Sequence, residues 1–165
     1  MRLDESPSPI DILVFEIGGR RFALPAPVVR EVHRAVAILP LPNAPPLVEG
    51  VIDVHGEIVP VLDVRARAGL SAAPVSLTDH LILVSTHERT VAIRADCATE
   101  LVRVDSADVA RLRGVAAPGD ERPGVVRLPD GLLLIEDLER FLDADGSRAL
   151  ELALRAGSDD RSANG

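Results

Sequence analysis

A mainly β fold made of two similar units is predicted by two internal repeats in the sequence. Residues 50–70, GVIDVHGEIVPVLDVRARAGL, have the pattern of a β-hairpin with a tight turn. The run GVVRLPDGLLLIEDL, which starts at Gly124, repeats the order glycine, apolar strand, turn and longer apolar strand. Residues 11–25 align in the same way with residues 80–94. The two offsets, 74 and 69 residues, differ by only five, which favours a duplicated architecture typical of a scaffold.

The first strand is predicted over residues 10–17, which are apolar and rich in β-branched side chains. Gly18 and Gly19 supply a turn, and the alternating residues 21–24 complete a hairpin. The prolines at positions 25 and 27 then favour a short helix, because proline is tolerated in a first helical turn. The apolar stripe of this helix would consist of Val28, Val29 and Val32.

The prolines of residues 39–46, LPLPNAPP, exclude both a helix and a strand ladder before the hairpin of residues 50–70. Residues 71–78 are small, polar and contain a proline, so they are the best candidate for a linker. After the second copy of the first hairpin, helices are expected at residues 106–112, where Ser106 is a plausible cap, at residues 136–142 and at residues 147–156.

One folded domain with short flanking segments is expected. The predicted ranges are residues 1–9 for a disordered N-terminus, 10–145 for the domain, 146–156 for a C-terminal helix and 157–165 for a disordered tail. Within the domain, the repeats predict a first subdomain of approximately residues 10–70 and a second of approximately residues 78–140.

The composition argues against a nucleic-acid partner. The chain has a formal net charge of −8 and no Trp or Tyr, so a cationic partner surface fits better than phosphates or stacked bases. The lone Cys97 cannot form an internal disulfide, which predicts a reducing compartment. The start MRLDESPSP has no leader pattern, and no apolar run approaches the length of a membrane span. We therefore expect a soluble, cytoplasmic protein.

We find no catalytic, metal or cofactor motif in the sequence. No two of the four histidines stand four residues apart and no CxxC occurs, so the usual spacing of zinc ligands is missing. The Gly18-Gly19 pair lacks a P-loop or GxGxxG continuation. Cys97 fits a small buried side chain better than a nucleophile, because no paired histidine is apparent.

Asp63 and Asp137 occupy equivalent positions just after a strand in the two repeats. Such residues more often cap strand ends or form ion pairs, for example Asp63 with Arg65, than act as a general acid and base. An enzyme is the alternative class, and it would require a deep polar pocket that joins Asp63, Asp137 or His55. Because the two aspartates belong to different units, we expect no such pocket.

His55 has the clearest case among the polar residues for contact with a partner. A two-residue turn exposes its side chains at the tip of a hairpin, where an imidazole is accessible. The alternative is an ordinary turn residue, since the turn itself needs only Gly56. The residues alone leave these two interpretations equally open.

Most of the chain resembles the CheW-like coupling proteins of bacterial chemotaxis arrays. The resemblance covers approximately residues 10–142 and begins with the opening LVFEIGGRRFALP, followed by VVREV at residues 28–32. The most specific segment is LPNAPPLVEGVIDVHGEIVPVLDVR at residues 41–65. It combines a proline-rich loop, a glycine, an apolar strand, a turn glycine, I-V-P-V, Asp and Arg.

This resemblance implies a non-enzymatic adaptor with two pseudo-equivalent five-stranded SH3-like β-barrel subdomains, short helices and no cofactor. Such adaptors join the cytoplasmic tips of methyl-accepting chemoreceptors to the regulatory domain of a CheA-type histidine kinase. They meet the membrane only indirectly, through the receptors, so a cytoplasmic place at receptor arrays is implied. The alternatives are a CheW-like scaffold that localises arrays, or an adaptor of a type IV pilus or other alternative chemosensory system.

The residues that this resemblance assigns to partner contact, or to places of backbone freedom, are Val29, Gly50, Asp53, His55 and Gly56. At the hairpin tip the family usually reads asparagine, apolar, Arg, Gly, whereas this chain reads Asp, Val, His, Gly. Histidine is smaller than arginine and lacks its permanent charge, and Asp53 adds a negative charge beside it. We therefore expect the contact at this tip to differ from that of the family.

Overall fold

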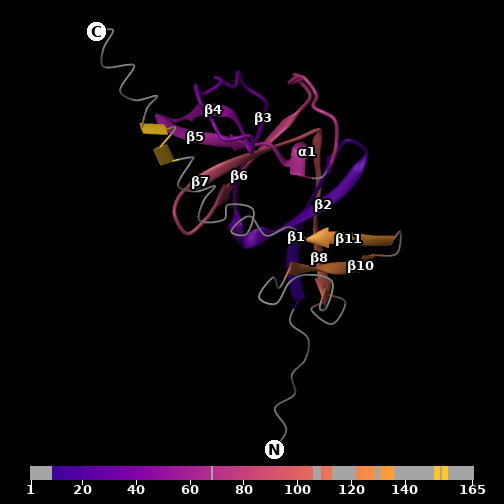
Figure 1. Ribbon diagram of the computed structural model, residues 1–165. Coiled ribbons are helices and arrows are strands. Elements are labelled where there is room, and N and C mark those ends of the chain that lie inside the picture. The colour runs from indigo at the N-terminus through magenta and orange to yellow at the C-terminus, as the bar shows by residue number, and fades with distance from the viewer. Residues whose placement is uncertain are drawn as a thin grey trace, which may run out of the picture.

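Strands dominate the part of the chain that the computed structural model describes, which is residues 9–67, 69–105, 109–112, 122–128, 131–135, 151–152 and 154–155 (Figure 1). The elements in chain order are β1 (Pro9–Ile17), β2 (Arg20–Pro25), the 3-10 helix η1 (Ala26–Val28), β3 (Val29–Arg34), β4 (Val48–Val54), β5 (Glu57–Leu62), α1 (Val64–Arg67), β6 (His80–Ser85), β7 (Thr90–Ala95), β8 (Cys97–Asp105), β9 (Val109–Leu112), β10 (Arg122–Leu128) and β11 (Gly131–Ile135).

The strands form two sheets. Sheet A has the order β8-β1-β2-β11-β10-β9, and sheet B has the order β3-β6-β7-β5-β4. Each sheet contains a parallel pair, β2 with β11 in sheet A and β5 with β7 in sheet B. The predicted mainly β fold with two five-stranded units is confirmed, and β9 adds a sixth strand to sheet A.

The two sheets have the same strand order once the sequence repeat is applied to them. The repeat matches β1, β2, β8, β10 and β11 with β6, β7, β3, β4 and β5, and this exchange turns the first five strands of sheet A into sheet B. The registers also agree, because Ile135 pairs with Ala23 while their equivalents, Val61 and Ala92, pair with each other. The duplication predicted from the sequence is therefore confirmed at the level of residue pairs.

The edge strands β8 and β3 share an irregularity at equivalent positions. In sheet A, Val14 pairs with Glu100, and the register shifts before the next residue of β1. In sheet B, Leu83 pairs with Glu31, and the register shifts before the next residue of β6. A bulge bends a strand and raises its twist, so both edge strands are bent beside their glutamate.

Each sheet takes one hairpin from the other half of the sequence. The β1–β2 hairpin lies between β8 and β11, and the β6–β7 hairpin lies between β3 and β5 (Figure 1). Each sheet therefore combines strands from both of the ranges predicted as subdomains, approximately residues 10–70 and 78–140. Apolar alternation specifies the two faces of a strand but not which distant strand pairs with its edge, so the exchange could not be deduced from the repeats.

Two segments predicted as helices are extended in part, and residues 106–108 of the second lie outside the described residues. Val29 and Val32 lie on β3, and the preceding 3-10 helix is only three residues long. Valine is β-branched and favours an extended backbone. As a strand, this segment also pairs with β6 through backbone hydrogen bonds that a short helix could not form. Residues 109–112 form β9 by pairing with β10.

Other predictions concern residues near the chain ends. Residues 151–152 and 154–155 are helical, in agreement with the helix expected over residues 147–156. The helix expected at residues 136–142, the catalytic alternative Asp137, residues 1–8 of the N-terminus and the tail at 157–165 lie outside the described residues.

The exchanged hairpins are buried on both faces, and one face of each joins the two sheets. Alternate residues of β6 pack into different hydrophobic clusters. Leu81 and Leu83 belong to a cluster formed by strands of sheet B alone, while Ile82 and Val84 belong to a larger core that both sheets share. That shared core combines Phe15, Ile17, Phe22 and Leu24 of sheet A with Leu62, Ile82, Val84, Val91 and Ile93 of sheet B. The two sheets are therefore packed through one core and are not merely tethered.

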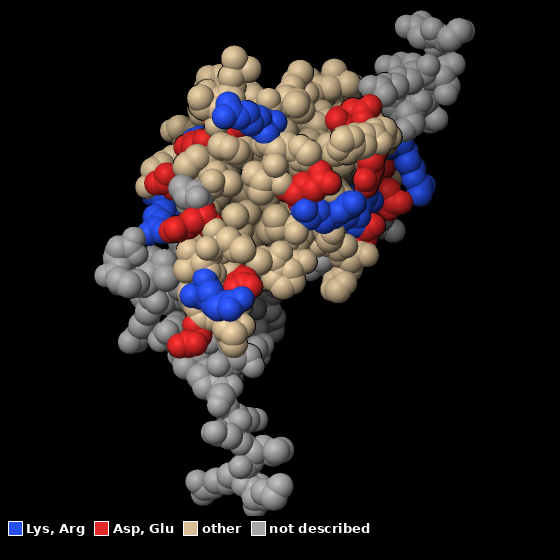
Figure 2. All heavy atoms as spheres, turned by 180° about the vertical axis from the view of Figure 1, so that it is seen from behind, with Lys and Arg blue, Asp and Glu red and all other residues tan. Residues whose placement is uncertain are grey.

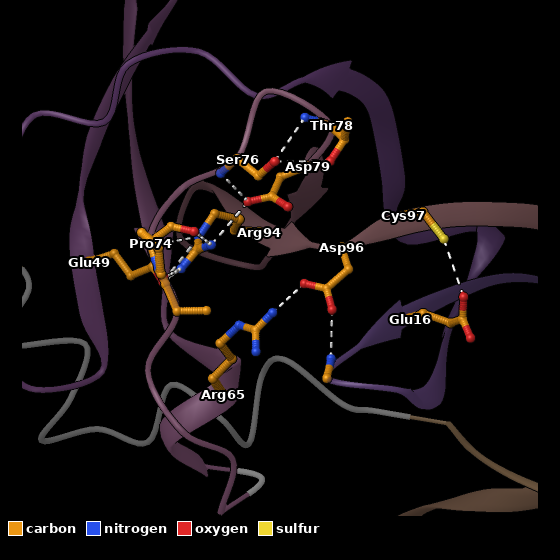
Figure 3. A network of polar contacts seen from close by, with 12 residues as sticks. Glu16, Glu49, Arg65, Pro74, Ser76, Thr78, Asp79, Arg94, Asp96 and Cys97 are labelled. Atoms are coloured by element: carbon orange, nitrogen blue, oxygen red, sulfur yellow. Dashed lines mark hydrogen bonds and ion pairs between the residues drawn. The ribbon is translucent and has the colours of Figure 1, made fainter.

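A buried arginine fixes the segment between the two repeats (Figure 3). Arg94 on β7 donates hydrogen bonds to Glu49 on β4 at 2.8 Å and to Asp79 at 3.0 Å. It also donates to the backbone carbonyl oxygens of Ala73 and Pro74 at 2.8 and 3.3 Å. The Glu49 carboxylate raises the pKa of Arg94 further, against the effect of burial, so this cation is permanent. The predicted linker is thus anchored to β4 and β7.

A second polar contact joins the two sheets (Figure 3). The Asp96 carboxylate accepts a short hydrogen bond from Arg65 on α1, and it accepts a second of 2.7 Å from the Gly18 N–H in the β1–β2 turn. Arg65, for which a pairing with Asp63 was one prediction, therefore forms an ion pair with Asp96. Helix α1 and the exchanged β1–β2 hairpin are held by the same carboxylate.

Candidate docking surface at the hairpin tip

The turn between β4 and β5 is made by His55 and Gly56. Both have positive φ, 51° and 87° respectively, as a type I′ hairpin turn requires. The Asp53 side chain supports the turn, because its Oδ1 accepts a hydrogen bond of 2.8 Å from the Gly56 N–H. The turn thus depends on the backbone of His55 as well as on Gly56, and it leaves the His55 side chain exposed.

The hairpin tip lies against β3, where a second histidine meets it. The rings of His55 and His33 are arranged edge to face with centroids 6.4 Å apart. The Nε2 of His33 makes a short hydrogen bond with the carboxylate of Glu31 on the same strand. This hydrogen bond lowers the pKa of Glu31, and positive charge on His33, His55 and Arg30 adds to the shift against the opposing effect of burial.

An arginine attaches the same hairpin to β3 and β7. The Nη1 of Arg30 donates a hydrogen bond of 2.6 Å to the Thr90 hydroxyl, and it lies 3.8 Å from the Glu57 carboxylate at the start of β5. Arg30 follows Val29 at the bulge of β3. Contacts from both its arginine and its histidine therefore hold β3 to the hairpin tip.

Val29 and Gly50, the other two residues predicted for partner contact or backbone freedom, lie away from the exposed tip. Val29 is half-buried and packs against the shared core. Gly50 is buried, and a Cβ there would lie 2.3 Å from the carbonyl oxygen of Leu39, which pairs with Val51. Gly50 is thus required for a close backbone approach. The structure brings Asp53, His55 and Gly56 together at the exposed tip.

Glu31 and His33 join the tip, and the sequence analysis did not assign them to the site. A strand over VREVHR would have placed them on one face, because residues two apart in a strand share a face. The helix predicted at this segment hid that relation. The strand signal was present in the two valines of VREVHR and in the repeat that aligns Glu31 with Glu100.

Exposed aliphatic side chains lie on the elements beside the tip. Val32 on β3 is 41% exposed and Ile58 on β5 is 43% exposed, and Ile58 pairs with Asp53 across the hairpin. Leu101 on β8, the repeat equivalent of Val32, is 65% exposed. Each sheet therefore carries an exposed aliphatic residue directly after the glutamate of its bulged edge strand, an arrangement suited to protein contact.

The described residues do not assemble the catalytic alternative. His55 and Asp63 stand at opposite ends of β5, whose six residues span about 20 Å at strand rise. The N–H of Asp63 donates to the Leu47 carbonyl oxygen at 2.6 Å, as expected at the end of a strand. No group of three or more His, Cys, Asp or Glu side chains suited to a metal ion occurs among the described residues.

Cys97 also has an ordinary environment for a structural thiol. It is half-buried on β8, and its Sγ donates a hydrogen bond of 3.4 Å to the Glu16 carboxylate (Figure 3). Burial raises the pKa of the thiol, and the hydrogen bond and negative charge of Glu16 act in the same direction. A raised pKa is the opposite of what a nucleophilic thiolate needs.

The duplicated, hairpin-exchanged sheets define a class of mainly β protein with two SH3-like subdomains. The CheW-like domain family matches residues 11–146, and the chain belongs to this family. The part of the chain that the structure describes holds no helix long and apolar enough to cross a membrane.

Several characterised proteins are similar to the chain. The chemotaxis protein CheW of Rhizobium meliloti is 23% identical over 141 residues, which cover 84% of this chain and 91% of that protein. Protein FrzA of Myxococcus xanthus is 30% identical over 99 residues, covering 60% of this chain and 62% of that protein. The crystal structure of the scaffolding protein TtCheW from Thermoanaerobacter tengcongensis superposes with a TM-score of 0.74 at 24% identity and covers 84% of this chain and 96% of that one.

Proposed function

We propose that this protein is a non-enzymatic adaptor that couples methyl-accepting chemoreceptors to a CheA-type histidine kinase in a chemosensory array. One observation carries the proposal: the two sheets repeat each other in strand order and register and are joined by a single core. A rigid body with two related faces can hold two partners in a fixed geometry without any chemistry of its own. Membership of the CheW-like family supports the same role.

The hairpin tip is the proposed contact surface on sheet B. Asp53, His55 and Gly56 are exposed there, and Ile58, which pairs with Asp53 across the hairpin, adds apolar surface. The net charge of −8 favours a cationic partner surface. Figure 2 shows side chains of both charge signs spread over one face of the molecule, with other residues between them.

A binding titration tests the proposal. The chain contains no lysine, so an amine-reactive dye couples only at the N-terminus, and fluorescence anisotropy can follow binding to the cognate kinase regulatory domain. We expect saturable binding by the full chain. Absence of binding to the kinase domain and to a receptor signalling fragment would overturn the adaptor function.

The variant His55→Asn tests the tip. Asn-Gly is the preferred pair for a type I′ turn, so the hairpin is retained, whereas His55→Ala would place alanine at a positive φ. We expect His55→Asn to weaken kinase or receptor binding by about five- to thirtyfold, the effect of a contact that contributes 1–2 kcal/mol. His87→Asn changes another exposed histidine, before β7, and should bind like the unmodified chain. Equal affinity of both variants would exclude the tip from the interface.

A second candidate is an adaptor of an alternative chemosensory system or a scaffold that localises arrays. The histidine at the tip, where the family usually has arginine, favours a dedicated partner. Deletion of the gene separates the roles: loss of the response with normally placed receptors supports coupling, and dispersed receptor clusters support localisation.

A further inference from the structure

Two histidines and a glutamate meet where the hairpin tip touches β3. We propose that His33, His55 and Glu31 act as one proton-binding cluster that changes the charge of the docking surface between about pH 5 and pH 8. The inference deepens the proposed function, on which it rests for its effect on binding. The cluster itself belongs to the free chain and can be tested there.

The backbone holds the two imidazoles near each other. His33 is fixed by the pairing of β3 with Leu81, and His55 is fixed by the turn in which its φ is 51°. The ring centroids are 6.4 Å apart. A proton on one ring is therefore close enough to oppose a proton on the other.

Glu31 supplies the charge that favours the first proton. Its carboxylate already bonds to the Nε2 of His33, and such a bond becomes stronger when the imidazole is protonated. The cluster carries one negative charge when both rings are neutral, no net charge after the first proton, and one positive charge after the second. The lowered pKa of Glu31, caused first by the His33 hydrogen bond, keeps this carboxylate charged over the range.

The other charged groups near the cluster come from three strands. Arg30 on β3 is paired with Glu57 on β5, and Asp53 on β4 accepts the hydrogen bond of the turn. Arg34, the residue after His33, is the last residue of β3. Histidine is the side chain whose charge changes between about pH 5 and pH 8, so we assign the change in charge to the two imidazoles.

A titration of the full-length chain followed by imidazole 15N chemical shifts tests the cluster. We expect His33→Gln to move the midpoint of the His55 curve to higher pH, and His55→Asn to do the same for His33, because each variant removes a competing positive charge. The expected size is about 0.3–0.7 pH unit, the range of exposed charge pairs. Glu31→Gln, which is nearly isosteric, should move both midpoints to lower pH.

His87 provides the matched control. It is exposed and lies in the segment between β6 and β7. We expect its own curve to stay unchanged in the three cluster variants, and His87→Gln to leave the curves of His33 and His55 unchanged. Curves for His33 and His55 that are the same in the unmodified chain and in every variant would overturn the proposal. If His33→Gln disturbs the fold, the variant His55→Asn, which keeps Glu31, gives the same test. In that variant the titration of the Glu31 carboxyl is followed by its 13C chemical shift.

A binding series separates this inference from the proposed function. At pH 8 the unmodified chain should bind the kinase regulatory domain, and lowering the pH to 5.5 should weaken a cationic partner's binding by about two- to fivefold for each charge gained. The double variant His33→Gln/His55→Asn should lose this pH dependence. If the imidazoles affect each other but binding does not change with pH, only the proposed effect of the cluster on binding is refuted. If the chain does not bind the kinase domain at any pH, only the proposed adaptor function is refuted.

Discussion

At the scale of the residue, the docking surface depends on backbone conformations that few side chains allow. His55 and Gly56 both take the left-handed region, where most residues are strained. Gly50 has ordinary backbone angles, and it is needed because the Leu39 carbonyl oxygen occupies the space of a side chain. Two glycines of one hairpin are thus required for different reasons, one conformational and one steric.

This difference predicts unequal costs for the same substitution. Gly50→Ala places a Cβ 2.3 Å from the Leu39 carbonyl oxygen, which is backbone and cannot rotate away. We expect a loss of about 2–4 kcal/mol of unfolding free energy, because β4 and the segment before it must separate. Gly56→Ala meets no atom within 4 Å and should lose about 1 kcal/mol from its positive φ alone.

Urea denaturation followed by circular dichroism measures both changes. Gly56→Ala is the matched control, since it makes the same chemical change six residues away in the same hairpin. Equal stability of the two variants would show that the segment carrying Leu39 moves freely and does not close the edge of β4.

The docking surface could be predicted from sequence only where local chemistry defines it. The pattern Asp53, Val54, His55, Gly56 specifies a two-residue turn, so the exposed tip follows from the residues themselves. Glu31 and His33 reach the same site through packing of β3 against the hairpin, a long-range contact. Prolines at positions 25 and 27 suggested a helix at that point. It forms as the three-residue η1, and the pairing of β3 with β6 makes the chain extended from Val29 onward.

At the scale of the element, the segment between the two repeats is an anchored strap. Arg94 lies beneath it, with 7% of its surface exposed, and bonds to two of its carbonyl oxygens as well as to Asp79 and Glu49. Small and polar residues alone would predict a mobile linker. The buried cation instead fixes the segment on β4 and β7. The position of the segment therefore depends on one side chain, that of Arg94.

Loss of that side chain should be costly. Arg94→Ala leaves the buried carboxylate of Asp79 and the half-buried carboxylate of Glu49 without their cation, and we expect a loss of about 3–5 kcal/mol of unfolding free energy. Arg103→Ala is the matched control, because it removes an arginine whose ion pair with Asp11 is exposed, and its midpoint should hardly move. Thermal unfolding followed by circular dichroism compares the two. Similar midpoints for both variants would show that the strap is not held by Arg94.

At the scale of the whole molecule, the sequence predicted the duplication but not the exchange. The repeat aligned Val61 with Ile135 and Ala23 with Ala92, and these residues do form equivalent pairs in the two sheets. The apolar pattern of a strand indicates which of its faces is buried, but it does not determine which other strand pairs with it in the sheet.

The exchange predicts that the two halves cannot separate. Each half gives its first hairpin to the other sheet, and the shared core includes Phe15 and Phe22 from one sheet and Ile82 and Ile93 from the other. A protease site inserted between residues 71 and 78 would cut the chain between the repeats. We expect the cleaved protein to elute as one species in gel filtration, with its circular dichroism unchanged, because parting the fragments would expose the core of both sheets. Reverse-phase separation in denaturant confirms that cleavage is complete. Two folded fragments that elute separately under native conditions would contradict the exchange and would instead support independent subdomains over approximately residues 10–70 and 78–140.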